Sequence, residues 1–389
     1  MRAFSQLTMS YPVKALRNIA IIAHIDHGKT TLIDKLLAQA GALQRGEDEG
    51  ERLMDSNDLE KERGITILAK NTSLIWKDLK INIVDTPGHA DFGGEVERIL
   101  SMVDSVLLLV DAVEGPMPQT RFVTTKAFKN GLNPIVMVNK VDRNGSRPYW
   151  VVDQVFDLFD QLGANEEQLD FPVIYGSAIL GKAGLEPDNL GDDLSCLLEV
   201  ICQQVEPPEA NPDGPLQMQI SALDYSSYVG VIGLGRIARG RIATGEQVTV
   251  VDRDGCERKG KVLQVMGYQG LGRAPIDGAS AGDIVCVTGL EGLKISDTIC
   301  VAEHVAALPA LEVDEPTISM TFQVNTSPFA GREGKFVTSR HLQERLDREL
   351  LYNVALRVEA TDHADRWHDR RRHPVRGAGV LLRRPDRRA

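Results

Sequence analysis

The sequence is short of cysteine, of long apolar runs and of positive charge, and each shortage argues against a class of protein. Its five cysteines form no C-x-x-C pair and no metal-ligand spacing, which is typical of reduced core residues in a cytoplasmic protein. No apolar run approaches membrane-spanning length, and Met1–Arg17 lacks the apolar segment of a signal peptide. Because the net charge is −11, any contact with nucleic acid would have to come from a local basic patch.

The most informative segment is the loop AHIDHGKT, Ala23–Thr30, which follows the apolar run Ile19–Ile22 and precedes apolar residues at helical spacing. A buried strand, a loop ending in Gly-Lys-Thr and an amphipathic helix predict a phosphate-binding loop. In such a loop Lys29 can reach the β- and γ-phosphates, and the Thr30 hydroxyl can ligate Mg²⁺. Since Ala23 stands where the usual pattern has glycine, an ordinary strand-to-helix turn is the alternative. The predicted contacts are Asp26, His27, Gly28, Lys29, Thr30 and Thr31.

Three further motifs follow apolar strands in the order expected of a guanine-nucleotide-binding protein. Asp85 opens DTPG, where a carboxylate can help to hold Mg²⁺. Asp142 closes NKVD and can accept hydrogen bonds from guanine groups that adenine lacks, although alone it could equally cap a helix. The pair Ser177-Ala178 can offer a backbone N–H to the guanine carbonyl. The nucleotide contacts predicted from these motifs are Asp85, Gly88, Asn139, Lys140, Asp142, Ser177 and Ala178.

The pattern of apolar residues divides the chain into several parts. Strands alternate with helices over residues 17–206, which predicts a parallel α/β sheet, and a breaker-rich linker follows at 207–215. Short strands with Gly and Asp turns over 216–312 predict a closed antiparallel β-barrel. The segment Gly233–Ala238 fits a dinucleotide fingerprint, but its surroundings alternate like strands, so we interpret it as part of the barrel. Residues 313–360 predict half of a split β-α-β (ferredoxin-like) α+β domain, and residues 1–16 a loose tail.

These motifs resemble the ribosome-associated translational GTPases, most closely the BipA/TypA type, over roughly residues 14–366. The resemblance rests on AHIDHGKTTLIDKLL, ERGITI, DTPGHADFGGEVERIL and NKVDR, and on a second block at 317–358 that contains NTSPFAGREGKFVTSR. Elongation factor G is the nearest rival, but it typically carries a large insertion between the two guanine-contacting motifs. Here Asp142 and Ser177 are only about 35 positions apart, which disfavours that type.

The resemblance implies a GTPase that binds GTP or GDP with Mg²⁺, works as a monomer in the cytoplasm and acts with the RNA and proteins of the ribosome. It implies that Thr66 closes over the γ-phosphate and Mg²⁺, and that His89 orients the attacking water once the ribosome turns it inward. Ile25 and Ile65 match apolar residues that screen this water, and Asp26 matches a position that can hold K⁺ or Na⁺. The alternatives are a plain surface loop around Thr66, a helix-cap role for His89 and core positions for the two isoleucines.

The resemblance stops at about Arg366, where the sequence turns to Arg, Pro, Gly and Ala. Residues 361–389 carry nine Arg and four Asp, a net +5, so that the residues before them carry −16. We interpret this segment as the product of a frameshift and expect it to be disordered; a basic RNA-binding tail is the alternative. Under the first interpretation the chain could be a truncated module that binds GTP but lacks productive coupling to the ribosome.

Overall fold

The computed structural model describes residues 11–42, 70–86, 93–226, 228–311, 338–352, 358, 360–362 and 378–380. The chain divides into two compact units, Met1–Leu311 and Glu312–Ala389, which are treated separately below. No helix among the described residues is long and apolar enough to cross a membrane. All five cysteines are described, and all are free thiols.

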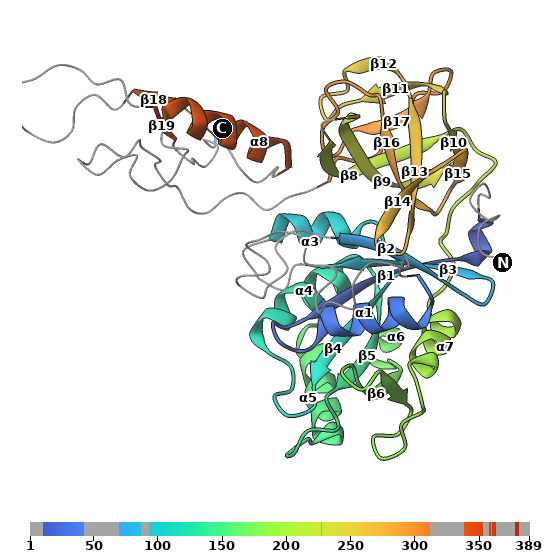
Figure 1. Cartoon of the computed structure of the whole chain (residues 1–389), viewed down its shortest axis with the longest axis vertical. Helices are drawn as coiled ribbons and strands as arrows, with labels where there is room; N and C mark the ends of the chain where they lie inside the picture. Colours follow the sequence, from blue (N-terminus) through green and yellow to red (C-terminus); the bar gives the residue numbers. More distant parts are fainter. Residues whose placement is uncertain are drawn as a thin grey trace, which may run out of the picture. The chain divides into compact units, whose positions relative to one another are not determined.

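The first unit begins with a seven-stranded sheet in the order β2-β3-β1-β4-β5-β6-β7 (Figure 1). The inner strands β3, β1, β4, β5 and β6 run parallel, and the edge strands β2 and β7 are antiparallel to their neighbours. This agrees with the α/β sheet predicted from the sequence. The strand bounds are β1 Leu16–Ala23, β2 Lys70–Trp76, β3 Leu79–Asp85, β4 Ser105–Asp111, β5 Asn133–Asn139, β6 Val173–Ser177 and β7 Lys182–Gly184.

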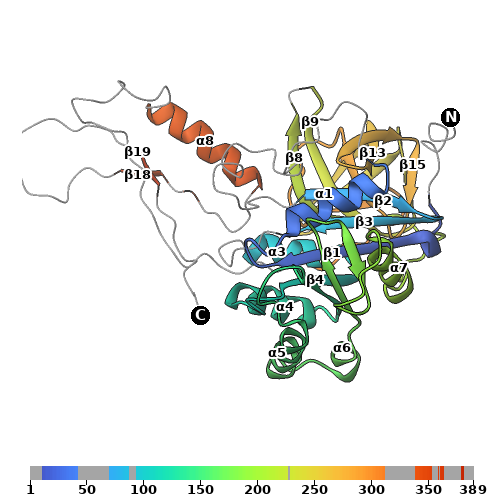
Figure 2. The ribbon, with the colours of Figure 1, turned by 60° about the horizontal axis from the view of Figure 1, so that its bottom comes forward.

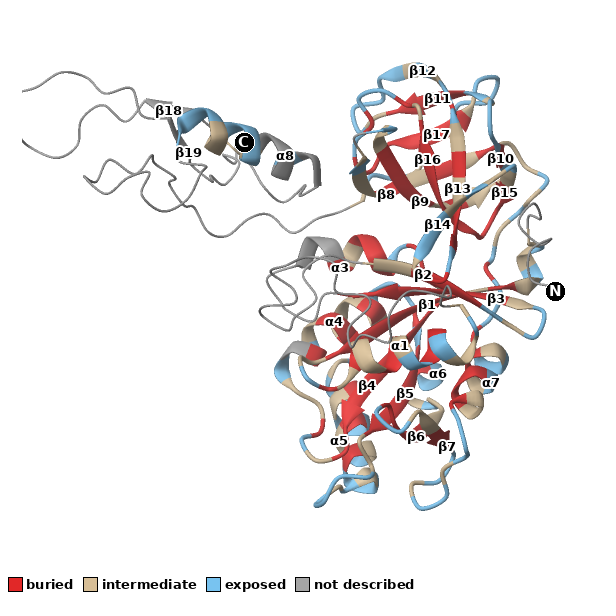
Figure 3. Cartoon of the chain, in the orientation of Figure 1, coloured by how far each residue is buried: buried red, intermediate tan, exposed pale blue. Residues whose placement is uncertain are grey.

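Helices cover both faces of this sheet, because side chains along each buried strand alternate between two apolar cores (Figure 2). Within β1, Ala20 and Ile22 enter the core beneath α3, α4 and α5, whereas Ile19 and Ile21 enter the core beneath α1 and α7. Figure 3 shows the resulting band of buried residues. The helices are η1 Val13–Ala15, α1 Lys29–Gln39, α3 Gly93–Leu100, α4 Pro118–Lys129, α5 Pro148–Gln161, α6 Glu166–Leu169 and α7 Ser195–Gln204.

The second part of this unit is an antiparallel β-barrel built on an eight-stranded sheet, β12-β11-β17-β8-β9-β16-β13-β14, with a separate pair, β10-β15. The segment Gly233–Ala238 lies inside strand β9, paired on both sides, so it is no dinucleotide site. The strands are β8 Gln217–Ser226, β9 Gly230–Arg239, β10 Arg241–Ala243, β11 Gln247–Val251, β12 Glu257–Lys261, β13 Gln264–Gln269, β14 Gly272–Ile276, β15 Gly278–Ser280, β16 Ile284–Thr288 and β17 Thr298–Val301.

Within the described part of the chain, no ladder joins the outer strands β12 and β14 of the eight-stranded sheet. The pair β10–β15 and hydrogen bonds from the Thr244 and Gly245 amides to the Asp277 and Val262 carbonyls link the strands there. The hairpin β13–β14 also extends to the α/β sheet. At its tip Gly270 exchanges two backbone hydrogen bonds with Ser73 of β2, with N···O distances of 3.3 and 2.9 Å. A Cβ on Gly270 would lie 2.2 Å from the Ala42 carbonyl oxygen, so only glycine permits this approach.

A buried polar cluster joins the α/β domain to the barrel. The Lys80 ammonium of β3 lies 2.8 and 2.9 Å from the two carboxylate oxygens of Asp283, just before β16, and both side chains are almost fully buried. Asn82 donates to Asp283 at 3.1 Å and to the Asn18 side chain at 2.8 Å. Asn18 in turn donates to the Gly282 carbonyl at 2.9 Å. A buried charge is tolerated only where such partners satisfy it, so these contacts fix one arrangement of the two domains.

Apolar contacts also hold the α/β domain against the barrel; we call this interface the joint. The core beneath α3 continues into the barrel, because Val96 and Leu100 of that helix share one cluster with Ile232, Leu234 and Ile284. A core shared in this way indicates that the α/β domain and the barrel pack as one body.

The second unit is described only in short pieces. Helix α8, Ser339–Tyr352, covers the helix expected in the incomplete α+β domain, whereas its expected first strand, Thr317–Val324, lies outside the described residues. Strand β18, Ala360–Asp362, pairs antiparallel with β19, Ala378–Val380. This pair differs from the expectation of a disordered tail, and the remaining tail residues lie outside the described ones. The division of the chain into parts beyond the matched domains stays a prediction.

The joint predicts a large effect of Lys80→Met on stability. The change leaves Asp283 buried without its cation, so the free energy of unfolding should fall by about 3 kcal/mol in urea denaturation. Lys77→Met is the matched control, because the Lys77–Glu199 pair is 66% and 47% exposed. It should cost less than about 1 kcal/mol. Equal losses in the two variants would show that the Lys80–Asp283 pair does not hold the joint.

Candidate nucleotide-binding site

The predicted motifs meet at one edge of the α/β sheet, because parallel strands bring their carboxyl ends together. The loop from Ala23 follows β1, the DTPG motif begins at the end of β3, NKVD begins at the end of β5, and Ser177 closes β6. Adjacent strands are in register at this edge, where Asp111 of β4 lies opposite Asn139 of β5.

The side chain of Asn139 connects three of these loops. Its Nδ2 donates to the His27 carbonyl at 2.8 Å, and its Oδ1 accepts from the Ala178 N–H at 2.8 Å. Asn139 is only 1% exposed, so both hydrogen bonds form away from water, where leaving them unmade would be costly. Gly28 lies against this amide with φ +95°, and a Cβ there would lie 2.5 Å from Nδ2. The glycine is therefore required by its backbone conformation and by the Asn139 contact together.

The phosphate end of the site is formed by the start of α1. Gly28 caps this helix without a side-chain hydrogen bond, and the first intrahelical bond runs from the Leu32 N–H to the Gly28 carbonyl. The N–H groups of Lys29, Thr30 and Thr31 consequently have no acceptor within the helix, which is the arrangement that binds phosphate. The Lys29 ammonium lies 2.7 Å from the Asp85 carboxylate and donates to the Thr86 carbonyl.

The donor set suits Mg²⁺. Among the described residues no group of three His, Cys, Asp or Glu side chains could hold a metal by itself. A hydroxyl at Thr30 and a carboxylate at Asp85 on the same edge are the hard oxygen ligands that Mg²⁺ takes together with substrate phosphates and water. Thr66, the third predicted ligand, lies outside the described residues.

At the base end, Asp142 is exposed and lies in a turn after β5. The next helix, α5, begins only at Pro148 with Arg147 as its N-cap, so Asp142 caps no helix there and that alternative is excluded. Ser177 is buried, and the Ala178 N–H is committed to Asn139. Lys140 has φ +63° and donates from Nζ to the Asp26 carbonyl at 2.6 Å, which links the NKVD loop to the phosphate-binding loop.

His27 is fully buried behind this loop and forms part of its structure. Its Nδ1 lies 3.4 Å from the Leu109 carbonyl oxygen, its Nε2 lies 3.5 Å from a Glu114 oxygen, and its ring meets the edge of His24. Burial lowers the pKa of His27 below the ordinary value of 6.5, although the Leu109 carbonyl and nearby carboxylates act against that shift. His27 is therefore neutral at pH 7.

Several predicted residues are not placed. Thr66, Ile65, Gly88 and His89 lie outside the described residues, so their roles stay predictions. Ile25 is partly buried in the phosphate-binding loop, and the neighbouring Asp26 is exposed with φ +64°.

The structure also brings in Asp111, which none of the predicted motifs contains. It ends the apolar strand β4 as Asp85 ends β3, and this shared pattern was the signal that could have revealed it.

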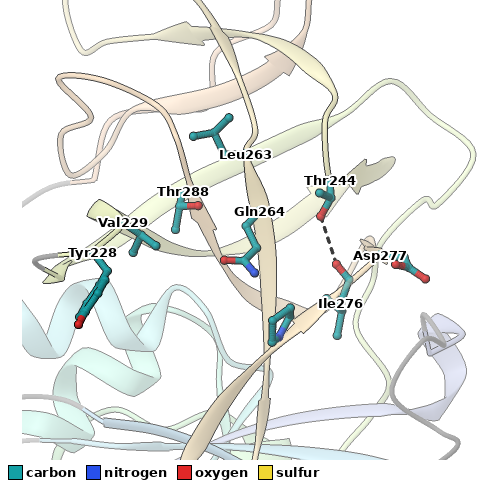
Figure 4. Close-up of a pocket in the computed structure, with 9 residues that line it drawn as sticks. Tyr228, Val229, Thr244, Leu263, Gln264, Ile276, Asp277 and Thr288 are labelled. Carbon is teal, nitrogen blue, oxygen red and sulfur yellow. Dashed lines mark hydrogen bonds between the residues drawn. The ribbon is translucent and has the colours of Figure 1, made fainter.

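A separate cavity of about 520 Å³ lies on the barrel (Figure 4). Two of its lining residues are hydrogen-bonded, with the Thr244 hydroxyl donating to the Ile276 carbonyl at 3.2 Å. None of its lining residues belongs to a nucleotide motif, so this cavity is distinct from the nucleotide site. It is lined by Tyr228, Val229, Thr244, Leu263, Gln264, Pro275, Ile276, Asp277 and Thr288.

Comparison with known families agrees with this geometry. Residues 14–207 match the elongation factor Tu GTP binding domain, and residues 230–300 match elongation factor Tu domain 2. Fold and site together thus define a P-loop GTPase domain of the elongation factor Tu class followed by its β-barrel domain.

Individual relatives narrow the class of protein further. The chain is 65% identical over 371 residues to the large ribosomal subunit assembly factor BipA of Haemophilus influenzae, covering 95% of this chain and 59% of that protein. The BipA of Escherichia coli K12 is 64% identical over 369 residues, with coverages of 95% and 60%, and that of Buchnera aphidicola is 62% identical over 347 residues, with coverages of 89% and 57%. The chain belongs to the BipA/TypA type, as its motifs indicated, and spans about 60% of the length of these relatives.

The burial of His27 predicts how stability changes with pH. Because its pKa is lowered in the folded protein, the unfolded chain takes up the proton first. The free energy of unfolding should therefore fall as pH drops below about 6.5, by up to about 1.4 kcal/mol per pH unit. Urea denaturation between pH 7.5 and 5.5 measures this slope. His27→Gln should flatten it; an unchanged slope in His27→Gln would refute the assignment.

Proposed function

We propose that the chain binds GTP and GDP together with Mg²⁺ and hydrolyses GTP to GDP and phosphate. The observation that best supports this proposal is the Asn139 carboxamide, which links the phosphate-binding loop to the Ser177-Ala178 loop by two buried hydrogen bonds. A plain strand-to-helix turn would need no such link to the loops expected to contact the base. The match to a GTP-binding domain over residues 14–207 supports the same function.

In the proposed reaction a water oxygen attacks the γ-phosphorus, the bond from this phosphorus to the β,γ-bridging oxygen breaks, and GDP leaves. Lys29 and the N–H groups at the start of α1 would offset negative charge on the phosphates, so that catalysis is mostly electrostatic. Bound Mg²⁺ would add positive charge at the β- and γ-phosphate oxygens. By resemblance, His89 orients the water, Thr66 contacts the γ-phosphate and Mg²⁺, and the Asp26 region can hold K⁺ or Na⁺.

We further propose that the ribosome is the partner that stimulates hydrolysis. The relatives at 62–65% identity are named large ribosomal subunit assembly factors, which supports this partner. The competing function is a GTP-binding module without productive ribosome coupling. Only the first function predicts faster hydrolysis in the presence of ribosomes.

Nucleotide choice depends on Asp142. Asp142→Asn should weaken GDP binding roughly 100-fold, because hydrogen bonds to a charged acceptor are lost, and should shift preference toward xanthine nucleotides. Competition titrations with GDP, XDP and ADP measure this preference. The matched control is Asp170→Asn, a carboxylate outside the predicted motifs, which should leave GDP affinity unchanged. Comparable ADP and GDP affinities in the unmodified protein would contradict guanine recognition.

Hydrolysis depends on His89 and on the partner. Steady-state phosphate release should be slow for the chain alone and should rise when purified ribosomes are added, since no arginine finger is evident in the sequence. His89→Ala should abolish the increase and leave GTP affinity nearly unchanged, because a water-orienting contact matters in the transition state. GTP binding without any ribosome-dependent increase would favour the competing function, and an unaltered rate in His89→Ala would remove His89 from the mechanism.

A further inference from the structure

Asp111 is a charged side chain that the nucleotide motifs do not account for. It is the last residue of β4, the strand between β1 and β5 in the α/β sheet, and it is 0% exposed. Its position opposite Asn139 places its carboxylate at the same sheet edge as the NKVD loop. A carboxylate is rarely buried so completely without partners that hold its charge.

Both oxygens of Asp111 have partners. Oδ2 lies 2.7 Å from the Lys140 ammonium, and Oδ1 accepts the Val113 N–H at 2.7 Å. Burial alone would raise the pKa of Asp111, but the hydrogen bonds from Lys140 and from the Val113 amide outweigh it, so the pKa is lowered. The surrounding groups thus stabilise the charged form of Asp111. Arg143 is a weaker partner, at 3.4 Å and with a side chain that is 54% exposed.

Lys140 connects Asp111 to the phosphate-binding loop. The same ammonium that contacts Asp111 donates to the Asp26 carbonyl at 2.6 Å. Lys140 and Asp26 both have positive φ, at +63° and +64°, a conformation that non-glycine residues adopt only when other contacts enforce it. Two strained residues from two loops therefore meet at one ammonium, and Asp111 is the buried anion that holds the ammonium there.

We propose that Asp111 is a positioning residue for the nucleotide site: it holds the Lys140 ammonium against the Asp26 carbonyl and so fixes the NKVD loop relative to the phosphate-binding loop. The proposal rests on the proposed binding of guanine nucleotide. It implies that the carboxylate retains bound nucleotide without touching it. Loss of its charge releases Lys140, the two loops separate more readily, and the nucleotide leaves faster.

The test measures release of a fluorescent N-methylanthraniloyl-GDP by stopped flow. Asp111→Asn keeps the shape and an oxygen that can accept the Val113 N–H, but removes the charge; release should be about tenfold faster. Lys140→Met should accelerate release at least as much, and the double variant should be no faster than Lys140→Met alone, because Asp111 acts through Lys140. Arg143→Gln is the matched control and should stay within about twofold of the unmodified protein.

A second measurement leaves Asp111 in place, in case Asp111→Asn does not fold. Lys140→Arg keeps a cation beside the Asp111 carboxylate, so it should release nucleotide more slowly than Lys140→Met, which leaves the buried carboxylate without one. Effects of the two substitutions that multiply in the double variant, unmodified release from Asp111→Asn, or equal release from Lys140→Arg and Lys140→Met would each overturn the proposal. An unmodified protein that binds no guanine nucleotide would instead overturn the proposed function, and the proposal with it.

Discussion

The nucleotide site depends first on the Asn139 carboxamide. One small side chain donates to the phosphate-binding loop and accepts from the loop after β6, and its 1% exposure means that water cannot replace either hydrogen bond. The amide also leaves no space for a side chain at Gly28, whose φ of +95° turns the chain into α1. The direction of the phosphate-binding loop, the start of its helix and the place of the Ser177-Ala178 loop all follow from this contact.

Such a contact is possible because the sheet behind it is apolar and rigid. The inner strands bury side chains on both faces, so the strands cannot slide past one another without exposing a whole face to water. Polar residues are then concentrated where the strands end. Asp85, Asp111, Asn139 and Ser177 each close a strand, and each is fully or almost fully buried. Partners from the adjoining loops, such as Lys29 for Asp85 and Lys140 for Asp111, make the burial of so many polar groups at one edge tolerable.

Much of this arrangement could be predicted from the sequence. Apolar runs that end in polar motifs predicted the strands, their parallel sheet and the set of residues at its edge, because strand period and loop chemistry are local properties. The joint between the domains was not predictable in this way. Lys80 and Asp283 are about 200 positions apart, and nothing in the local pattern around either residue specifies the other. The contact of Asp111 with the site was not predictable for a related reason, since it is made to Lys140, a partner in another loop.

The hairpin β13–β14 shows how the two domains constrain each other, because it belongs to the barrel and its tip is bonded to β2 of the α/β sheet. Strand β2 directly follows the segment that contains Thr66, and α3, which packs on the barrel, begins four residues after His89. β2 and α3, which border the segments that contain Thr66 and His89, therefore both contact the barrel. A shift of β2 or α3 must break or re-form these contacts, because the Ser73–Gly270 hydrogen bonds and the shared apolar core hold both elements against the barrel.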